Sequence, residues 1–125
     1  MSKILIVEDN EKNMKLVRDV LRHQGHATLE ARTGEVGMQL AVEHTPDLIL
    51  LDIQLPGMDG IATLGQLRAV ATLNAVPVIA VSASVMPEDQ RSIGASGFDA
   101  YITKPISLRP FLAMVERLLT EGRAT

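Results

Sequence analysis

The chain has 125 residues, of which 46% are apolar and 22% charged, and this length and composition suit one folded domain over residues 1–125. It contains no cysteine, which excludes disulfides and thiolate metal sites and agrees with a cytoplasmic location. Its net charge is −3, its basic residues are scattered, and no apolar run approaches the roughly 20 residues that span a bilayer, so we expect neither nucleic-acid nor membrane binding.

Five short hydrophobic runs alternate with segments of helical periodicity. The first, third and fourth runs are nearly continuous Ile, Leu and Val, which is typical of strands buried on both faces of a parallel sheet. The predicted strands are Lys3–Val7, Ala27–Ala31, Asp47–Leu51, Val76–Val81 and Ala100–Thr103.

The segments between and after these strands are predicted as helices. Gly25 is a plausible stop for the first helix, and Ser107 is a good N-cap for the last. The segments Gly34–Glu43 and Pro87–Ala95 have weaker apolar stripes, and we expect the latter to be short and mobile. Apolar residues at helical spacing mark the other three helices: Met14, Val17 and Leu21; Ile61, Leu64 and Leu67; and Phe111, Val115, Leu118 and Leu119.

Polar residues follow the predicted strands on one side of the sheet. Strict alternation of strands and helices predicts an α/β sandwich with a parallel sheet, and such sheets bind ligands at the carboxyl ends of their strands. The residues at these ends are Glu8 and Asp9, Asp52, Ser82 and Lys104.

Each of these residues has an ordinary interpretation when it is taken alone. Asp9 or Asn10 could cap the first helix, Ser82 could be a turn hydroxyl, and Lys104 could be a surface amine. Together, however, three carboxylates at one edge repel one another unless a cation lies among them, and oxygen ligands suit Mg²⁺. A hydroxyl and a lysine opposite the metal would then hold the oxygens of a phosphoryl group.

The sequence resembles the receiver domain of two-component response regulators along essentially its whole length. The matching stretches are ILIVEDN at 4–10, PDLILLDIQLPGMDG at 46–60, VSAS at 81–84 and YITKPIS at 101–107. The resemblance is particularly close to stand-alone members of the family, although receiver modules of hybrid kinases share the EDN start. It implies a doubly wound (βα)5 fold with a five-stranded parallel sheet in the order 2-1-3-4-5.

The resemblance also implies which residues hold the metal and the phosphate. Asp52 would be the phosphorylated carboxylate. Asp9, Asp52 and the backbone carbonyl of Gln54 would ligate Mg²⁺, for which Mn²⁺ can substitute, and Glu8 would act mainly through a metal-bound water. The side chains of Gln54 and Ser84 would flank the site, either tuning the attack of water on the phosphate or serving as plain rim residues.

Three further residues would respond to the phosphate. The resemblance implies that Lys104 contacts the phosphoryl oxygens, that Ser82 closes on them as the switch hydroxyl, and that Tyr101 turns inward as the switch aromatic. The peptide bond that precedes Pro105 would be cis, although X-Pro bonds in general are cis in only about 5–6% of cases.

The expected function is that of a signalling phospho-acceptor, not of a metabolic enzyme. A sensor histidine kinase or a histidine phosphotransfer protein would supply a phosphohistidine, and the domain would assist its own phosphorylation and dephosphorylation. A downstream protein would bind the face formed by segment Pro87–Ala95, strand Ala100–Thr103 and the last helix. Only Glu121–Thr125 follow that helix, so we expect either a stand-alone regulator, a relay intermediate or sink, or a module excised from a larger protein.

Three other functions fit the residues less well. A haloacid-dehalogenase-type phosphatase would need a second aspartate where Gln54 stands. An FMN carrier would need a phosphate loop rich in Ser, Thr or Gly after the first strand, but the sequence there is EDNE, which would repel phosphate. A pseudo-receiver that only docks partners would not need the intact set of acceptor, acidic pair, hydroxyl and lysine.

Overall fold

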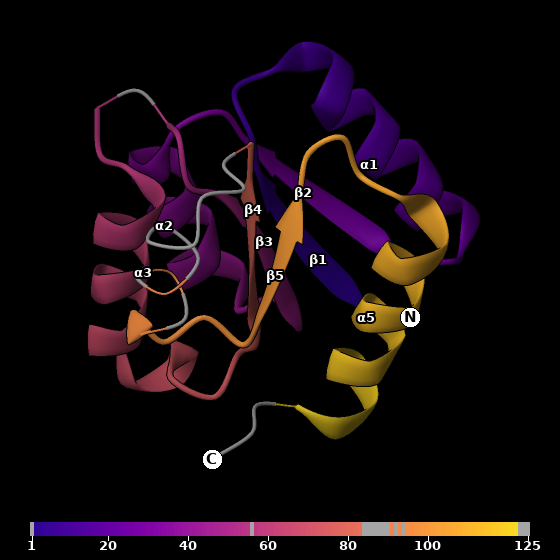
Figure 1. The fold of residues 1–125 in the computed structure, drawn as a ribbon. Coiled ribbons are helices and arrows are strands. Elements are labelled where there is room, and N and C mark those ends of the chain that lie inside the picture. Colours follow the sequence, from indigo (N-terminus) through magenta and orange to yellow (C-terminus); the bar gives the residue numbers. More distant parts are fainter. Residues whose placement is uncertain (1, 56, 84–90, 92, 94, 123–125) are drawn as a thin grey trace.

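A five-stranded parallel sheet forms the centre of the computed structural model (Figure 1), which describes residues 2–55, 57–83, 91, 93 and 95–122. The strand order is β2-β1-β3-β4-β5, as predicted. The strands are β1 (Lys3–Val7), β2 (Ala27–Ala31), β3 (Leu48–Asp52), β4 (Val78–Ser82) and β5 (Ala100–Thr103).

The boundaries of two strands differ from the sequence prediction, and both strands end one residue later than expected. β3 begins and ends one residue later than expected and therefore includes Asp52 as its last residue. β4 begins at Val78 rather than at Val76, because Pro77 has no backbone N–H to donate to the neighbouring strand. The carbonyl oxygen of Pro77 still accepts a hydrogen bond from the N–H of Ile49 at 3.0 Å, so Pro77 lies directly before the strand.

Helices cover both faces of the sheet, with α1 and α5 on one side and α2 and α3 on the other (Figure 1). Alternate residues of β1 point to opposite faces of the sheet. Ile4 and Ile6 therefore pack in the core beneath α1 and α5, and Leu5 and Val7 pack in the core beneath α2 and α3. The helices are α1 (Glu11–His23), α2 (Gly34–His44), α3 (Gly60–Ala69) with a short 3-10 turn η1 (Ala71–Leu73) after it, and α5 (Leu108–Glu121). The predicted helix at Pro87–Ala95 lies largely outside the described residues.

The predicted apolar faces of the helices are mostly buried. In α1 the stripe of Met14, Val17 and Leu21 is fully confirmed. In α3 one prediction was wrong: Leu64 is buried, but Ile61 is 37% exposed because the helix turns its glycine and threonine side toward the core. Ser107 does occupy the N-cap of α5, but its side chain makes no capping hydrogen bond to the described residues.

No helix among residues 2–55, 57–83 and 95–122 combines the length and hydrophobicity that crossing a membrane would require.

Gly60 brings the start of α3 directly against the end of β3. A Cβ atom at this position would lie 2.6 Å from the carbonyl oxygen of Asp52 and 2.7 Å from the Cα atom of Ile53. The backbone N–H of Gly60 also donates to the carbonyl oxygen of Ile53 at 3.0 Å. Only glycine therefore permits this approach of helix to strand, beside the predicted phospho-acceptor.

Replacing Gly60 by alanine should destabilise the fold, because the added methyl group meets backbone atoms that cannot move aside. We expect Gly60→Ala to lower the free energy of unfolding by roughly 1–3 kcal/mol in urea denaturation followed by circular dichroism. Gly65 is the matched control, since it lies in the same helix and a Cβ there would meet nothing within 4 Å. Gly65→Ala should instead stabilise by roughly 0.5–1 kcal/mol through helix propensity. Equal stabilities of the two variants would contradict the close contact.

Candidate functional site

Three carboxylates meet at the carboxyl end of the sheet. Glu8 and Asp9 follow β1, and Asp52 ends β3, the neighbouring strand. One carboxylate oxygen from each residue lies within 4.8 Å of the others. Glu8 and Asp52 are buried, with only 5% and 2% of their surfaces exposed, whereas Asp9 is exposed. The site is thus closed on the side of the sheet and open toward solvent at Asp9.

Backbone N–H groups orient two of these carboxylates. The N–H of Gln54 donates to Oδ1 of Asp52 at 2.8 Å, and the N–H of Asn10 donates to Oε2 of Glu8 at 3.1 Å. Asn10 also caps α1, since its side-chain oxygen accepts from the N–H of Asn13 at 3.0 Å. The cap of α1 is therefore Asn10 and not Asp9, which leaves the carboxylate of Asp9 available for the site.

Lys104 places its ammonium group between the two buried carboxylates. Its Nζ lies 2.8 Å from Oδ2 of Asp52 and 3.0 Å from Oε1 of Glu8. The residue directly follows β5, and its backbone N–H donates to the carbonyl oxygen of Ser82 at 2.8 Å. The bond from Lys104 to Pro105 is cis, the isomer that the family resemblance implies. One cation thus links side chains from β1 and β3 with the end of β5.

Burial and repulsion change the protonation of this cluster. Burial raises the pKa of Glu8 from 4.5 to about 7, and the adjacent carboxyl of Asp52 adds to the rise. Burial alone would lower the pKa of Lys104, but its hydrogen bonds to Asp52 and Glu8 outweigh this and raise the pKa above its ordinary value. Lys104 is therefore charged at neutral pH, while Glu8 holds its proton more tightly than an ordinary glutamate.

This donor set fits a hard divalent cation. All three side chains offer oxygen atoms, which are the ligands that Mg²⁺ and Mn²⁺ prefer. Burial first, and then the adjacent carboxyl of Asp52, raises the pKa of Glu8, and a bound cation would favour its charged form. Asp9, which contacts solvent, would let the ion keep several of its waters.

The remaining predicted residues lie on or near β4 and β5. Ser82 ends β4 and is 1% exposed, and the register places it opposite Thr103 of β5. Tyr101 is half-buried on β5 and lines a hollow of about 230 Å³, together with Pro110 and Met114 of α5. Ser84 lies outside the described residues.

Comparisons with known proteins agree with this geometry. A family model described as the response regulator receiver domain matches residues 4–116. The chain belongs to this family. The polar-differentiation response regulator DivK of Brucella ovis is 45% identical to it over 119 residues, covering 95% of this chain and 97% of the relative.

Two solved receiver domains have the same fold. The receiver domain of a signal transduction histidine kinase from Syntrophus aciditrophicus is 32% identical, with a TM-score of 0.89 over 96% of this chain and 91% of that one. The receiver domain of sensor histidine kinase PA1611 from Pseudomonas aeruginosa is 28% identical, with a TM-score of 0.90 over 96% and 98%. That structure has a magnesium ion coordinated in its active-site cleft. The protein is thus a receiver domain, a signalling module of two-component systems.

Sequence reasoning missed the backbone contribution to this receiver site. It assigned Gln54 a carbonyl and a side-chain role, but not the N–H bond that fixes Asp52. It also missed that the N–H of Asn10 holds Glu8. Backbone donors carry no side-chain signature, so the only sequence signal was the position of these residues two places after the carboxylates that they bond.

The pKa of Glu8 predicts how the stability of the metal-free receiver depends on pH. Because the folded state binds this proton more tightly than the unfolded state, the free energy of unfolding should fall as pH rises from 4.5 to about 7. The raised pKa of Lys104 adds a contribution that is constant over this window, since it is lost only above the ordinary lysine value of 10.5.

Urea denaturation in EDTA at several pH values measures this slope, and a variant without the Glu8 carboxyl provides the comparison. Glu8→Gln should flatten the profile because it removes the proton while keeping the size of the side chain. Saturating Mg²⁺ should flatten the wild-type profile as well, since a cation would compensate the charged carboxylate. Identical slopes for wild type and variant in EDTA would refute the assignment to Glu8.

Proposed function

We propose that Asp52 of this receiver accepts a phosphoryl group from a phosphohistidine. The observation that supports this most directly is the state of its carboxylate. It is 2% exposed, fixed by the N–H of Gln54, and bound by the ammonium of Lys104 at 2.8 Å. A carboxylate that is ionised and oriented in this way needs no general base to act as a nucleophile.

The transfer exchanges one bond to phosphorus for another. An oxygen of Asp52 attacks the phosphorus in line, and the P–N bond breaks with its electron pair going to the imidazole of the donor. Oδ2 of Asp52 is occupied by Lys104 before the reaction, so the ammonium has to move onto the incoming phosphoryl oxygens. Lys104 would thereby neutralise charge on the group that is transferred, and the receiver assists its own phosphorylation.

The metal would be held by the carboxylate cluster. The proposed ligands of Mg²⁺, or of Mn²⁺ in its place, are Asp9, Asp52 and the backbone carbonyl of Gln54, with Glu8 acting through a water. When bound, the ion would supply positive charge that offsets the charge of the phosphoryl oxygens. The closeness of the three carboxylates and the raised pKa of Glu8 support this assignment.

Ser82 and Tyr101 would pass the signal on to a partner. Ser82 lies at the end of β4, next to the strand that carries Asp52, and its hydroxyl would bind the phosphoryl group. Tyr101 borders the hollow against α5, which offers its ring room to turn inward. We propose that a downstream protein binds the surface of segment Pro87–Ala95, β5 and α5, and that phosphorylation shifts this surface between two conformations.

The remaining parts of the proposal concern the cellular setting. The donor would be a sensor histidine kinase or a histidine phosphotransfer protein in the cytoplasm. Residues 1–125 would act as one receiver domain, either as a stand-alone regulator like DivK or as a relay intermediate. The side chains of Gln54 and Ser84 would tune the lifetime of the phosphorylated state.

Phosphorylation with a labelled donor tests the acceptor. Wild-type protein incubated with radiolabelled acetyl phosphate and Mg²⁺ should become labelled, and the label should be lost in Asp52→Asn and in EDTA. Asp19→Asn is the matched control, because this carboxylate lies exposed on α1 and should leave labelling unchanged. Stable labelling of Asp52→Asn would rule out the acceptor role of Asp52.

Metal binding can be measured without any phosphoryl donor. Titration with Mn²⁺, followed by the electron paramagnetic resonance signal of the free ion, should give one site in wild-type protein. Asp9→Asn should weaken this site by roughly tenfold or more, because it loses a charged ligand. Asp19→Asn should bind Mn²⁺ like wild type, and equal affinity of Asp9→Asn would exclude Asp9 as a ligand.

A further inference from the structure

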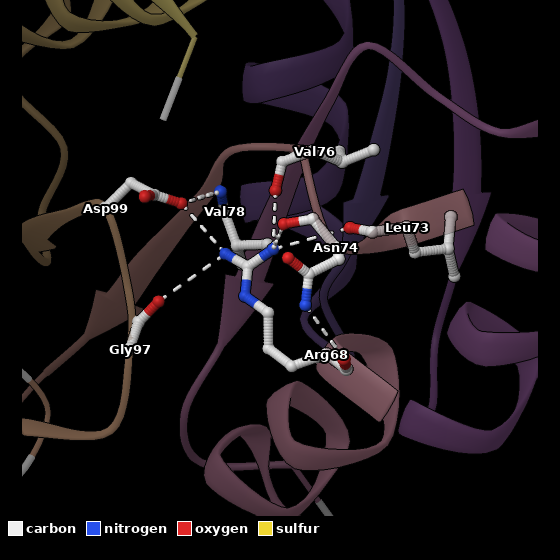
Figure 2. A network of polar contacts seen from close by, with 7 residues as sticks. All are labelled: Arg68, Leu73, Asn74, Val76, Val78, Gly97 and Asp99. Atoms are coloured by element: carbon white, nitrogen blue, oxygen red, sulfur yellow. Dashed lines mark hydrogen bonds and ion pairs between the residues drawn. The ribbon is translucent and has the colours of Figure 1, made fainter. Parts of the chain in front are cut away.

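A partly buried ion pair lies at the amino-terminal end of β4 and β5, which is the opposite end of the sheet from the carboxylates. Figure 2 shows this pair and its neighbours. Arg68, near the end of α3, directs its guanidinium group toward the chain around β4 and β5. Its Nη2 lies 2.9 Å from Oδ2 of Asp99, and only 15% and 6% of the two side chains are exposed. The guanidinium also donates to the carbonyl oxygens of Val76 (2.7 Å), Asn74 (3.3 Å), Leu73 (3.4 Å) and Gly97 (3.4 Å).

Asp99 connects this guanidinium to the first residue of β4. Its Oδ2 also accepts a hydrogen bond from the N–H of Val78 at 2.8 Å, and its own N–H donates to the carbonyl oxygen of Val78 at 2.9 Å. Asp99 directly precedes β5, which begins at Ala100. The guanidinium therefore joins the end of α3, the entrance of β4 and the entrance of β5 in one network.

β5 is held along the sheet by its pairing with β4 and by contacts at its two ends. It is an edge strand of four residues, hydrogen-bonded within the sheet to β4 alone. At its carboxyl end the N–H of Lys104 bonds to Ser82, and the ammonium of Lys104 reaches Asp52 and Glu8. The strand is thus held at its entrance by Asp99 and at its exit by Lys104.

The shape of the guanidinium matters as well as its charge. A planar fork with several N–H donors can bond to Val76 on one side and to Asp99 and Gly97 on the other at the same time. A lysine at this position would offer one point charge and could not satisfy both sides in the same geometry. The backbone carbonyls would then lose partners in a partly buried place.

We propose that Arg68 is a positioning residue for the phosphoryl-transfer site, acting through Asp99 and β5 on the placement of Lys104. This inference rests on the function proposed for Asp52 and Lys104. The proposed metal ligands follow β1, end β3 or follow β3, and none of them lies on β5. Loss of the Arg68 network should therefore disturb the lysine and leave the metal site intact.

Two variants test this, compared under conditions in which circular dichroism shows each to be folded. Arg68→Lys keeps the charge but loses the fork. The double variant Arg68→Met with Asp99→Asn removes both charges, so that no lone buried charge remains. Both should lower the rate of labelling by acetyl phosphate at saturating Mg²⁺ by about tenfold, because a small misplacement of a reacting group costs much of the rate. Both should bind Mn²⁺ at least as tightly as wild type, because the proposed ligands stay in place and a displaced ammonium repels the ion less.

Amide hydrogen exchange provides a readout that does not depend on phosphorylation. Arg68→Lys should reduce the protection of the Lys104 amide, which bonds to Ser82, and leave that of the Glu8 amide, which bonds to Ala31. The matched control is Arg18→Lys, because Arg18 is also partly buried and pairs with Glu30 at 3.0 Å, but lies on α1. This control should change neither labelling nor exchange.

The outcomes separate the positioning role from its alternatives. Wild-type labelling together with unchanged Lys104 protection in folded Arg68→Lys would overturn the proposal. Equal loss of labelling, Mn²⁺ affinity and protection at both amides would also overturn it, because that pattern indicates general loosening. If the wild type itself failed to label at Asp52, the proposed function would fall, and the exchange at Lys104 alone would decide whether Arg68 positions β5.

Discussion

The arrangement of this receiver depends on the repulsion between carboxylates that the sheet forces together. Parallel strands end at the same edge, so the residues after β1 and β3 cannot avoid one another. The fold compensates the two buried carboxylates with one ammonium, that of Lys104, and with two backbone N–H groups. Burial, and after it the carboxyl of Asp52, still raises the pKa of Glu8, so its charged form is not fully stabilised. A site in this condition favours an added cation, and this preference underlies the proposed chemistry.

The same lysine ties this electrostatic balance to an edge strand of the sheet. β5 pairs within the sheet only with β4, yet it contains Tyr101 and directly precedes Lys104. A change at Asp52 therefore acts on a strand that has one neighbour instead of two. Its entrance is fixed by Arg68 and Asp99, so displacement is expected at its exit, where the phosphoryl group would lie. If the start of β5 stays fixed and its end near Lys104 shifts, the conformational change would be passed on to α5.

The strands and the set of side chains could be predicted from the sequence, because both leave clear patterns, whereas the strand order was implied only by the resemblance to receiver domains. Continuous Ile, Leu and Val marked β1, β3 and β4, and the polar residues that followed them marked the edge where Glu8, Asp9, Asp52 and Lys104 meet. The weak stripe of α2 had a physical cause: its buried face consists of Gly34, Gly37 and Ala41, which hydrophobicity scales barely register. The role of Arg68 could not be predicted, since most of its acceptors are backbone carbonyls that no residue type reveals.

Gly60 has a consequence for how sequences of this kind can vary. Its N–H donates to the carbonyl of Ile53, and its Cα lies against the backbone of Asp52. One hydrogen bond at the start of α3 therefore joins the two ends of the loop between Ile53 and Gly60. Substitutions within this loop are compatible with the hydrogen bond between Gly60 and Ile53. We expect an inserted or deleted residue to disrupt it, because the length of the loop changes. Relatives that keep the acceptor site are therefore expected to differ in the composition of this loop and to agree in its length.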